Sequence, residues 1–301
     1  MAERNISTMQ LGMAFKEIRL RKKMSLRQVS EGLTNHSYVS KFEKGEYNIS
    51  LVQLMNLLDN MHVSYDEYVA ILQKDSVFEK YRDYTHAMQS RDIYGLAKTF
   101  AELDKMAFHS ETARIMDAGL RCGLQHFLHL EHNAASKEDM ALVKHRLAST
   151  EYWTHFDTIL VQAYVLVAPH DELKPFVKQV EHVLEKDATT LSFSEKKHLT
   201  RILLNCFIAS VEHDSLDIAE QMKKYCMKYI TGDYPDQCIA YKIYETELLI
   251  KQGMSQEAFE IIHELRPLLL KFNVSQNYLL IDRLDQMVAN LLFQDSGKGN
   301  N

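Results

Sequence analysis

The sequence predicts an all-α protein in two parts, a small N-terminal domain and a longer body built from helical repeats. Only 4 Pro and 10 Gly interrupt its 301 residues, so long segments are free to stay helical. Apolar residues recur at helical spacing in most of these segments. From residue 78 on, breaks between the expected helices bring helix pairs back about every 40 residues, which is the period of helical solenoids.

Composition and the N-terminal segment restrict the class of protein. Hydrophobic residues make up 46% of the chain and charged residues 25%, as in ordinary globular proteins. No run approaches the length of apolar sequence that a membrane span needs, so no membrane partner is expected. Residues 1–10 contain no apolar signal-peptide core, which predicts a cytoplasmic protein.

The first two helices of the N-terminal domain are bounded by capping residues. The first is expected over residues 11–23. Ser25 caps the second, because its hydroxyl can accept a hydrogen bond from a free backbone amide of the first turn. Gly32 ends the second helix, since glycine tolerates a left-handed backbone. The residues expected to face inward are Leu11, Phe15, Ile18, Leu26, Val29 and Leu33.

A third, short helix carries the residues expected to read DNA. Asn35 is its N-cap, and Val39 and Phe42 face inward, so small polar and basic side chains cover the other face. Such a helix suits the major groove, where these side chains can meet base edges and phosphates. The expected contacts from residues 35–43 are Asn35, His36, Ser37, Tyr38, Ser40 and Lys41. Flanking phosphate contacts are expected from Arg27, Gln28, Tyr47 and Asn48.

Two more helices complete the domain. Ser50 caps the fourth, and the fifth follows residues 62–64. The apolar and aromatic residues that they carry are Leu51, Leu54, Leu57, Leu58, Tyr65, Tyr68, Val69 and Leu72. The domain would then span residues 1–72, with residues 73–77 as a linker to the body.

Charge is divided unevenly between the two parts. The net charge is −6, yet residues 1–50 hold 9 Lys/Arg against 5 Asp/Glu, and the rest of the chain holds 26 against 36. Because salt screens charges beyond about 10 Å, local charge decides the attraction to phosphate. A basic head on an acidic body is therefore compatible with binding of double-stranded DNA through the head.

The end of the third helix resembles a known DNA-binding family. Residues 40–45, SKFEKG, are similar to the signature of phage-repressor-type (Xre) helix-turn-helix domains, and Arg19 lies six residues before Ser25 as in that family. The resemblance implies that Arg19 pairs with Glu43 and fastens the first helix to the third. Leu26 departs from the family, since many members carry there a Gln that contacts DNA. The alternative is a helical hairpin with no DNA-binding role.

The body, residues 78–294, is expected to hold helices of 12–20 residues with short breaks, and residues 295–301 a disordered tail. The whole layout resembles the Rgg family of Gram-positive bacterial regulators. The matching features are the Xre head at the N-terminus, the length near 300, the all-helical body and the aromatic segment EYWTHF at residues 151–156. The resemblance implies a homodimer with a right-handed, degenerate tetratricopeptide-like body. It also implies a concave groove for a short signalling peptide.

Three body helices carry polar stripes on otherwise apolar surfaces. A helix that is apolar nearly all round is buried, so its polar stripe needs a partner or a cavity. On the inner helices of a solenoid, such stripes would form a groove that suits an extended peptide. The expected peptide-binding residues are Arg114, Arg121, Gln125, His198, Arg201, Asn205, Gln237, Tyr241, Tyr244 and Leu248. Internal hydrogen bonds or a dimer interface remain the alternatives for the same stripes.

Signatures of enzymes and metal sites are weak. The chain has no phosphate-binding glycine loop, no nucleophile elbow and no dinucleotide fingerprint. His263 and Glu264 begin a zinc-protease-like string, but Pro267 stands where its second His belongs. His126, His129 and His132 recur every three residues around Glu131, which favours a surface histidine cluster over a metal site. No enzyme activity, metal or cofactor is therefore expected.

The four cysteines show no pairing motif. In a cytosolic chain they are expected to be reduced. Cys122, Cys206 and Cys238 lie in apolar helical contexts and are expected in the core. A redox sensor is the alternative.

The function predicted from these patterns is a sequence-specific transcription regulator that binds a promoter operator and is controlled by a signalling peptide, as in quorum sensing. The first alternative is an Xre-type regulator whose body only dimerises or senses a non-peptide signal. The second is an enzyme or scaffold with a decaying helix-turn-helix. Serine and lysine on the recognition face argue against the second alternative.

Overall fold

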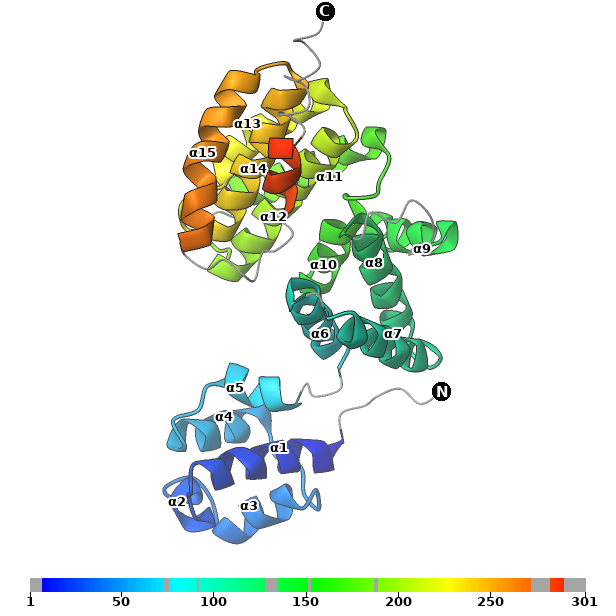
Figure 1. The fold of residues 1–301 in the computed structure, drawn as a ribbon. Coiled ribbons are helices and arrows are strands. Elements are labelled where there is room, and N and C mark those ends of the chain that lie inside the picture. The colour runs from blue at the N-terminus through cyan, green and yellow to red at the C-terminus, as the bar shows by residue number, and fades with distance from the viewer. Residues whose placement is uncertain are drawn as a thin grey trace, which may run out of the picture.

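The computed structural model describes residues 7–72, 76–90, 92–127, 135–150, 153–186, 189–271 and 282–289. All regular structure in these ranges is helical, which confirms the all-α class. Figure 1 shows the N-terminal helices at one end of the molecule and the last long helix, α15, in the body at the other end. Among the described helices, none is long and apolar enough to cross a membrane.

The head consists of five short helices. They are α1 (Thr8–Arg21), α2 (Leu26–Ser30), α3 (His36–Glu43), α4 (Leu51–Asn60) and α5 (Tyr65–Leu72). Ser7, Ser25 and Ser50 each start a helix with a capping box, in which a Gln three residues on returns the hydrogen bond. Asn35 caps α3 by accepting a hydrogen bond from the Ser37 amide. Three of these four caps are the ones that the sequence predicts.

α1 and α3 approach each other so closely that only glycine fits between them. A Cβ atom added at Gly12 would lie 1.9 Å from the carbonyl oxygen of Phe42. The rings of Phe15 and Phe42 then meet edge to face, 5.5 Å apart, at the centre of the head. Tyr68 closes this core from α5, with its hydroxyl donating to the carbonyl of Leu11 at 3.0 Å.

Leu33, which was expected on the apolar stripe of the second helix, is exposed in the structure, as are Leu51 and Tyr65. Leu33 is 43% exposed, Tyr65 47% and Leu51 58%. α2 ends at Ser30, so Leu33 falls in the following turn and leaves the apolar stripe. Leu51 and Tyr65 occupy the first positions of α4 and α5, at the edge of the core.

The body begins with α6, whose first residue, Val77, was expected in the linker. Its helices are α6 (Val77–Ser90), α7 (Ile93–Ala107), α8 (Glu111–Phe127), α9 (Lys137–Ala148), α10 (His155–Tyr164), α11 (His170–Lys186), α12 (Phe193–Glu212), α13 (Leu216–Tyr229), α14 (Pro235–Lys251) and α15 (Ser255–Lys271). A further helical segment covers residues 282–289.

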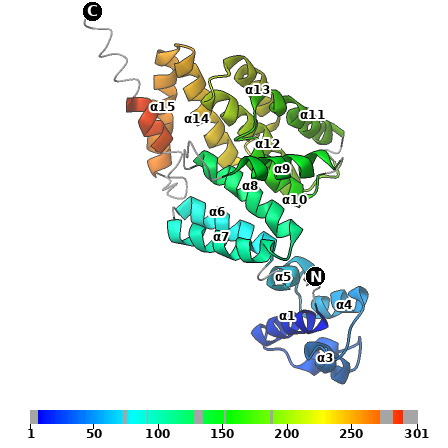
Figure 2. The same ribbon diagram turned by 90° about the vertical axis from the view of Figure 1, so that its right-hand side faces the viewer.

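Neighbouring helices pack as repeated pairs. α6 packs on α7, α8 on α9, α12 on α13 and α14 on α15. The helices α6, α8, α10, α12 and α14 also pack on one another in that order, so they form one continuous layer. Figure 2 shows the stack from a second direction. The helical-repeat architecture expected from the sequence is therefore confirmed.

The layer curves, and its concave side is the inner face, on which Phe78, His126, His155 and Glu212 lie. Phe78 of α6 stacks on His155 of α10 with ring centroids 5.8 Å apart, although α8 lies between these helices in the order of packing. In the same way, His126 of α8 reaches Glu212 of α12, with Nδ1 and Oε2 3.3 Å apart. Alternate helices of the layer thus meet across the inner face.

Several sequence-based expectations fall outside the described residues. These are the linker residues 73–75, His129, Glu131 and His132, Glu151 and Tyr152, and the tail 295–301. The expectation that Cys238 lies in the core is wrong, because this residue is only half-buried, whereas Cys226 is buried. Cys226 packs against α12, and its thiol lies 3.7 Å from the carbonyl oxygen of Leu203.

Candidate DNA-binding and ligand-binding faces

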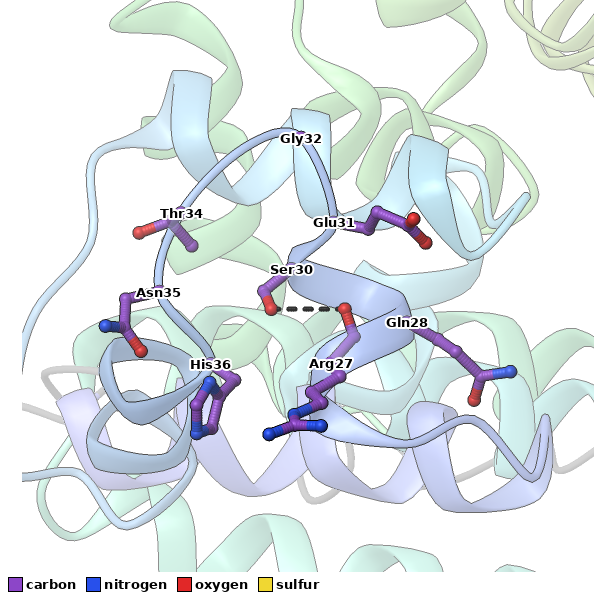
Figure 3. A pocket seen from close by; sticks show the side chains of 8 residues that line it. All are labelled: Arg27, Gln28, Ser30, Glu31, Gly32, Thr34, Asn35 and His36. Atoms are coloured by element: carbon purple, nitrogen blue, oxygen red, sulfur yellow. Dashed lines mark hydrogen bonds between the residues drawn. The ribbon is translucent and has the colours of Figure 1, made fainter.

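A hollow of about 410 Å³ lies between α2 and α3 on the surface of the head. Arg27, Gln28, Asn35 and His36, four of the expected DNA contacts, line it. Figure 3 shows the side chains of Arg27 and His36 close together on the same side of the turn that joins the two helices. The fold therefore brings a guanidinium and an imidazole to the start of the expected recognition helix.

The outer side of α3 carries uncommitted polar groups. His36, Ser37 and Lys41 are exposed, although the Ser37 hydroxyl donates to Asn35 Oδ1 at 3.0 Å. Within the described residues, Arg27, His36 and Lys41 make no side-chain hydrogen bond or ion pair, so their donors are available to a partner. Ser40 is half-buried on the same helix.

The other expected DNA contacts also hold the head together. Gln28 returns the capping bond of Ser25, with Oε1 2.8 Å from the Ser25 amide. The Tyr38 hydroxyl lies 3.4 Å from the carbonyl oxygen of Asn48, and its ring meets Tyr47 edge to face at 4.7 Å. Tyr47 and Asn48 are exposed beside α3, so Tyr38 ties the following loop to the helix.

A buried ion pair fixes α3 against α1. Arg19 donates from Nε and Nη2 to the two carboxylate oxygens of Glu43, with Nη2 and Oε2 2.8 Å apart. Its Nη1 donates to the carbonyl of Met24 at 2.8 Å, just before α2. The side chains are only 10% and 5% exposed. The hydrogen bonds to Glu43 raise the pKa of Arg19 despite this burial.

On α8, the expected ligand-binding residues contact neighbouring elements. Arg121 donates from Nε to Asp117 at 2.7 Å and from Nη2 to Asp104 of α7 at 3.2 Å. Gln125 accepts from the amide of Ala135 at 3.2 Å, ahead of α9. Arg114 is exposed, and its nearest acid is Glu111 at 3.8 Å.

The stripe on α12 bridges the helices on either side of it. His198 Nδ1 lies 3.1 Å from Gln162 Nε2 of α10, and Asn205 donates to the Gln162 carbonyl at 2.7 Å. On the other side, Arg201 donates through Nη2 to Asp236 at the start of α14. Burial lowers the pKa of His198 to about 4, helped by repulsion from His155 and nearby cations. The ring is therefore neutral at pH 7.

The stripe on α14 is mostly buried. Gln237 donates to the Lys197 carbonyl at 2.8 Å, and Leu248 is fully buried. Tyr241 donates to Glu245 on its own helix at 2.9 Å, and Tyr244 donates to Glu212 of α12, also at 2.9 Å. Burial raises the pKa of both tyrosines.

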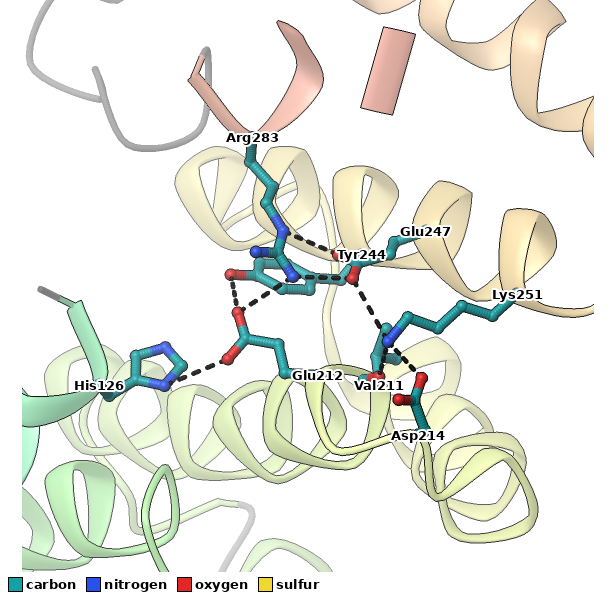
Figure 4. A network of polar contacts seen from close by, with 8 residues as sticks. All are labelled: His126, Val211, Glu212, Asp214, Tyr244, Glu247, Lys251 and Arg283. Carbon is teal, nitrogen blue, oxygen red and sulfur yellow. Dashed lines mark hydrogen bonds and ion pairs between the residues drawn. The ribbon is translucent and has the colours of Figure 1, made fainter. Parts of the chain in front are cut away.

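The structure also assembles charged residues that the sequence patterns did not single out. Figure 4 shows Arg283 reaching from the segment 282–289 to Glu247 and Glu212, beside Tyr244 and Lys251. Arg283 Nη2 lies 2.7 Å from Glu247 Oε1 and 3.4 Å from Glu212 Oε1. Asp236 is the matching acid at the opposite end of α14. In a sequence, a charged residue near the end of a helix is normally taken to be exposed to solvent. For this reason the sequence patterns did not identify these charged residues.

The spacing of charged residues along α12 and α14 could have identified Glu212, Asp236 and Glu247 from the sequence. Arg201 and Glu212 are eleven positions apart on α12, and Asp236 and Glu247 are eleven apart on α14. Eleven residues make three turns with a remainder of about 20°, so each pair shares one side of its helix.

Comparison with known proteins agrees with this description. Residues 15–68 match the model of a helix-turn-helix family. No curated protein sequence matches the chain. Three solved structures resemble it over nearly its whole length, each at under 20% sequence identity.

The first of these is the SHP pheromone receptor Rgg2 of Streptococcus dysgalactiae, with a TM-score of 0.64, 17% identity, and coverage of 93% of this chain and 99% of the receptor. The second is a protein of Listeria monocytogenes EGD-e described as a transcriptional regulator, with a TM-score of 0.68, 17% identity, and coverage of 95% and 98%. The third is PrgX in complex with cCF10, with a TM-score of 0.58, 15% identity, and coverage of 93% of both chains. The resemblance to Rgg regulators expected from the sequence is thus confirmed in fold, and the head is a helix-turn-helix domain.

Proposed function

We propose that this chain is a non-enzymatic, cytoplasmic transcription regulator that binds operator DNA through α3 and responds to a short peptide held on the inner face of its body. The observation that carries the proposal is the combination of two parts in one fold. A helix-turn-helix head with a free lysine on α3 and a free arginine on α2 is joined to a curved helical-repeat body, and one of the structural relatives with this arrangement is a pheromone receptor.

The head would read DNA in the usual way for its motif. α3 enters the major groove with His36 and Ser37 at its leading end and Lys41 one turn on. Arg27 and the loop after α3 hold the flanking phosphates. The remaining contacts in this proposal are Gln28, Asn35, Tyr38, Ser40, Tyr47 and Asn48.

The body would receive the peptide beside Arg201. Burial lowers the pKa of Arg201 more strongly than Asp236 raises it. Its Nε and Nη1 have no partner among the described residues, although a guanidinium offers five N–H donors. A partly buried cation with unused donors favours an anionic or carbonyl-bearing ligand. An extended peptide supplies both groups.

Assembly and domain division complete the proposal. A single head contacts too little DNA for useful specificity, so a two-fold dimer reading two half-sites is expected. We assign residues 1–72 to DNA binding, 73–77 to the linker and 78–294 to peptide sensing and dimerisation.

A body that only dimerises or senses a non-peptide signal is the second candidate. The internal hydrogen bonds of Asn205 and Tyr244 favour it, because groups satisfied within the chain need no ligand.

Two measurements on the full chain test the proposal. In the first, rounds of selection from random duplex DNA should enrich a sequence with two related half-sites. In the second, a library of short synthetic peptides should raise the melting temperature. Selection of DNA without any stabilising peptide would favour the second candidate, and failure to enrich DNA would contradict the regulator itself.

A further inference from the structure

The inner face has a basic end. Lys197 and Arg201 of α12 both approach the carboxylate of Asp236, with Lys197 Nζ 3.3 Å from Oδ1 and Arg201 Nη2 on Oδ2. Two cations thus share one acid among the described residues. His155 and His198 lie next to them with ring centroids 4.7 Å apart, and burial lowers the pKa of both rings, so they add no charge at pH 7.

The basic end also contains an unused acceptor. Gln237 is completely buried, and its Nε2 donates to the Lys197 carbonyl. Its Oε1 has no hydrogen-bond partner among the described residues. A buried carboxamide oxygen without a donor is unfavourable.

The opposite end of the same face is acidic. Glu212, Glu247 and Asp214 share the two cations Lys251 and Arg283, with N–O distances of 2.6–3.7 Å. Glu212 and Glu247 are nearly buried, with side chains 14% and 11% exposed. Among the described residues these three carboxylates thus share two permanent cations, and the His126 ring, 3.3 Å from Glu212, is a further partner.

The two ends are aligned along the helices. On α12, Arg201 and Glu212 share one side of the helix, and on α14 Asp236 and Glu247 do the same. Eleven residues at 1.5 Å each separate the ends by about 16 Å. An extended peptide covers that distance with about five residues at 3.3 Å each. The helix dipoles favour the same orientation of a bound peptide, because helix N-termini favour anions and C-termini favour cations.

We propose that the inner face binds its peptide in one direction, with the C-terminal carboxylate at Lys197 and Arg201 and the N-terminal ammonium at Glu212 and Glu247. This inference rests on the proposed function and names the ligand class within it: a peptide with both ends free. In the unliganded chain Asp236 holds the basic end partly neutralised, and a ligand carboxylate adds the missing negative charge. Apolar residues of the ligand lie between the two ends.

The test uses three forms of one synthetic pentapeptide library, randomised over Leu, Ile, Val, Phe, Ala and Gly. One form is free at both ends, one is N-acetylated and one is C-amidated. Each is passed over the immobilised full-length protein at low salt, and the retained peptide is quantified by mass spectrometry. We expect acetylation and amidation each to reduce retention about tenfold, the value of one charge-assisted hydrogen bond.

Matched variants then assign each end. In Arg201→Gln, C-amidation should no longer reduce peptide retention, while N-acetylation still does. In Glu212→Gln, N-acetylation should no longer reduce retention, while C-amidation still does. Asp236→Asn, which removes the internal acid, should increase retention of peptides with a free carboxylate. Lys224→Gln, an exposed position on the outer helix α13, should leave both dependences unchanged.

The outcomes separate this inference from the proposed function. If no library form is retained, the proposed peptide response is contradicted, and the direction of binding with it. If peptides are retained equally in all three forms, the peptide response stands and the inference is overturned. It is also overturned if Arg201→Gln removes the acetylation dependence, because that result places the ammonium at the basic end.

Discussion

Breaking the Arg19–Glu43 pair should abolish DNA binding without removing any group that touches DNA. In Arg19→Leu, Glu43 would remain in the core at 5% side-chain exposure without its counterion. Removal of one partner from a buried ion pair costs about 3–5 kcal/mol. A domain the size of residues 7–72 has a free energy of unfolding of only about 3–10 kcal/mol. The head should therefore be largely unfolded or close to it.

The assay is chemical denaturation followed by circular dichroism, with DNA affinity measured by fluorescence anisotropy. We expect the denaturation curve of Arg19→Leu to lack the unfolding transition of the head, which the unsubstituted protein shows at low denaturant concentration. DNA binding should weaken at least tenfold. The double variant Arg19→Met with Glu43→Leu should restore both, because replacing a whole buried pair by apolar residues is close to neutral. A single variant that unfolds as the unsubstituted protein does, or a double variant that is folded but cannot bind DNA, would refute this reasoning.

Four further outcomes are expected. Changing His36, Ser37 and Lys41 together to Ala should abolish sequence-specific DNA binding at unchanged melting temperature; full affinity would exclude α3 as the recognition helix. Arg201→Ala should abolish the peptide response; a protein that melts several degrees lower yet still responds would show that Arg201 is only the partner of Asp236. His198 is neutral in the fold down to about pH 4, whereas an unfolded histidine takes up a proton below about pH 6.5. Stability should therefore be full above pH 6.5 and fall by about 1–2 kcal/mol toward pH 4, allowing for partial exposure; a His198→Gln variant with the same slope would contradict this. Light scattering should give twice 35.0 kDa, and a monomer on DNA at micromolar concentration would exclude the dimer.

The head was largely predictable because its signals are local. Ser25, Asn35 and Ser50 mark helix starts by side chains that bond within three residues, and apolar spacing places Phe15, Val29 and Phe42 in the core. Leu33 was misplaced because the stripe assumes that the helix continues past Ser30. Nothing in the spacing alone shows that α2 stops after five residues.

The inner face was predictable only in part, because its chemistry is decided by tertiary contacts. The apolar surroundings of Arg201 show that the guanidinium needs an acid or a ligand. They do not show that Asp236, on the next inner helix, supplies the acid. Likewise, Tyr244 reads as a free aromatic in the sequence, while in the fold its hydroxyl binds Glu212. Partners that lie one repeat away along the chain leave no trace in local periodicity.

The central claim is that peptide binding on the inner face controls DNA binding by the head. Its most direct test is the affinity of the full chain for its selected operator, titrated with the single peptide most strongly retained from the free-ended library. We predict that saturating peptide changes the operator affinity at least fivefold in the unsubstituted protein and leaves it unchanged in the Arg201→Gln, Glu212→Gln double variant. An operator affinity that stays constant while the peptide demonstrably binds would contradict the account.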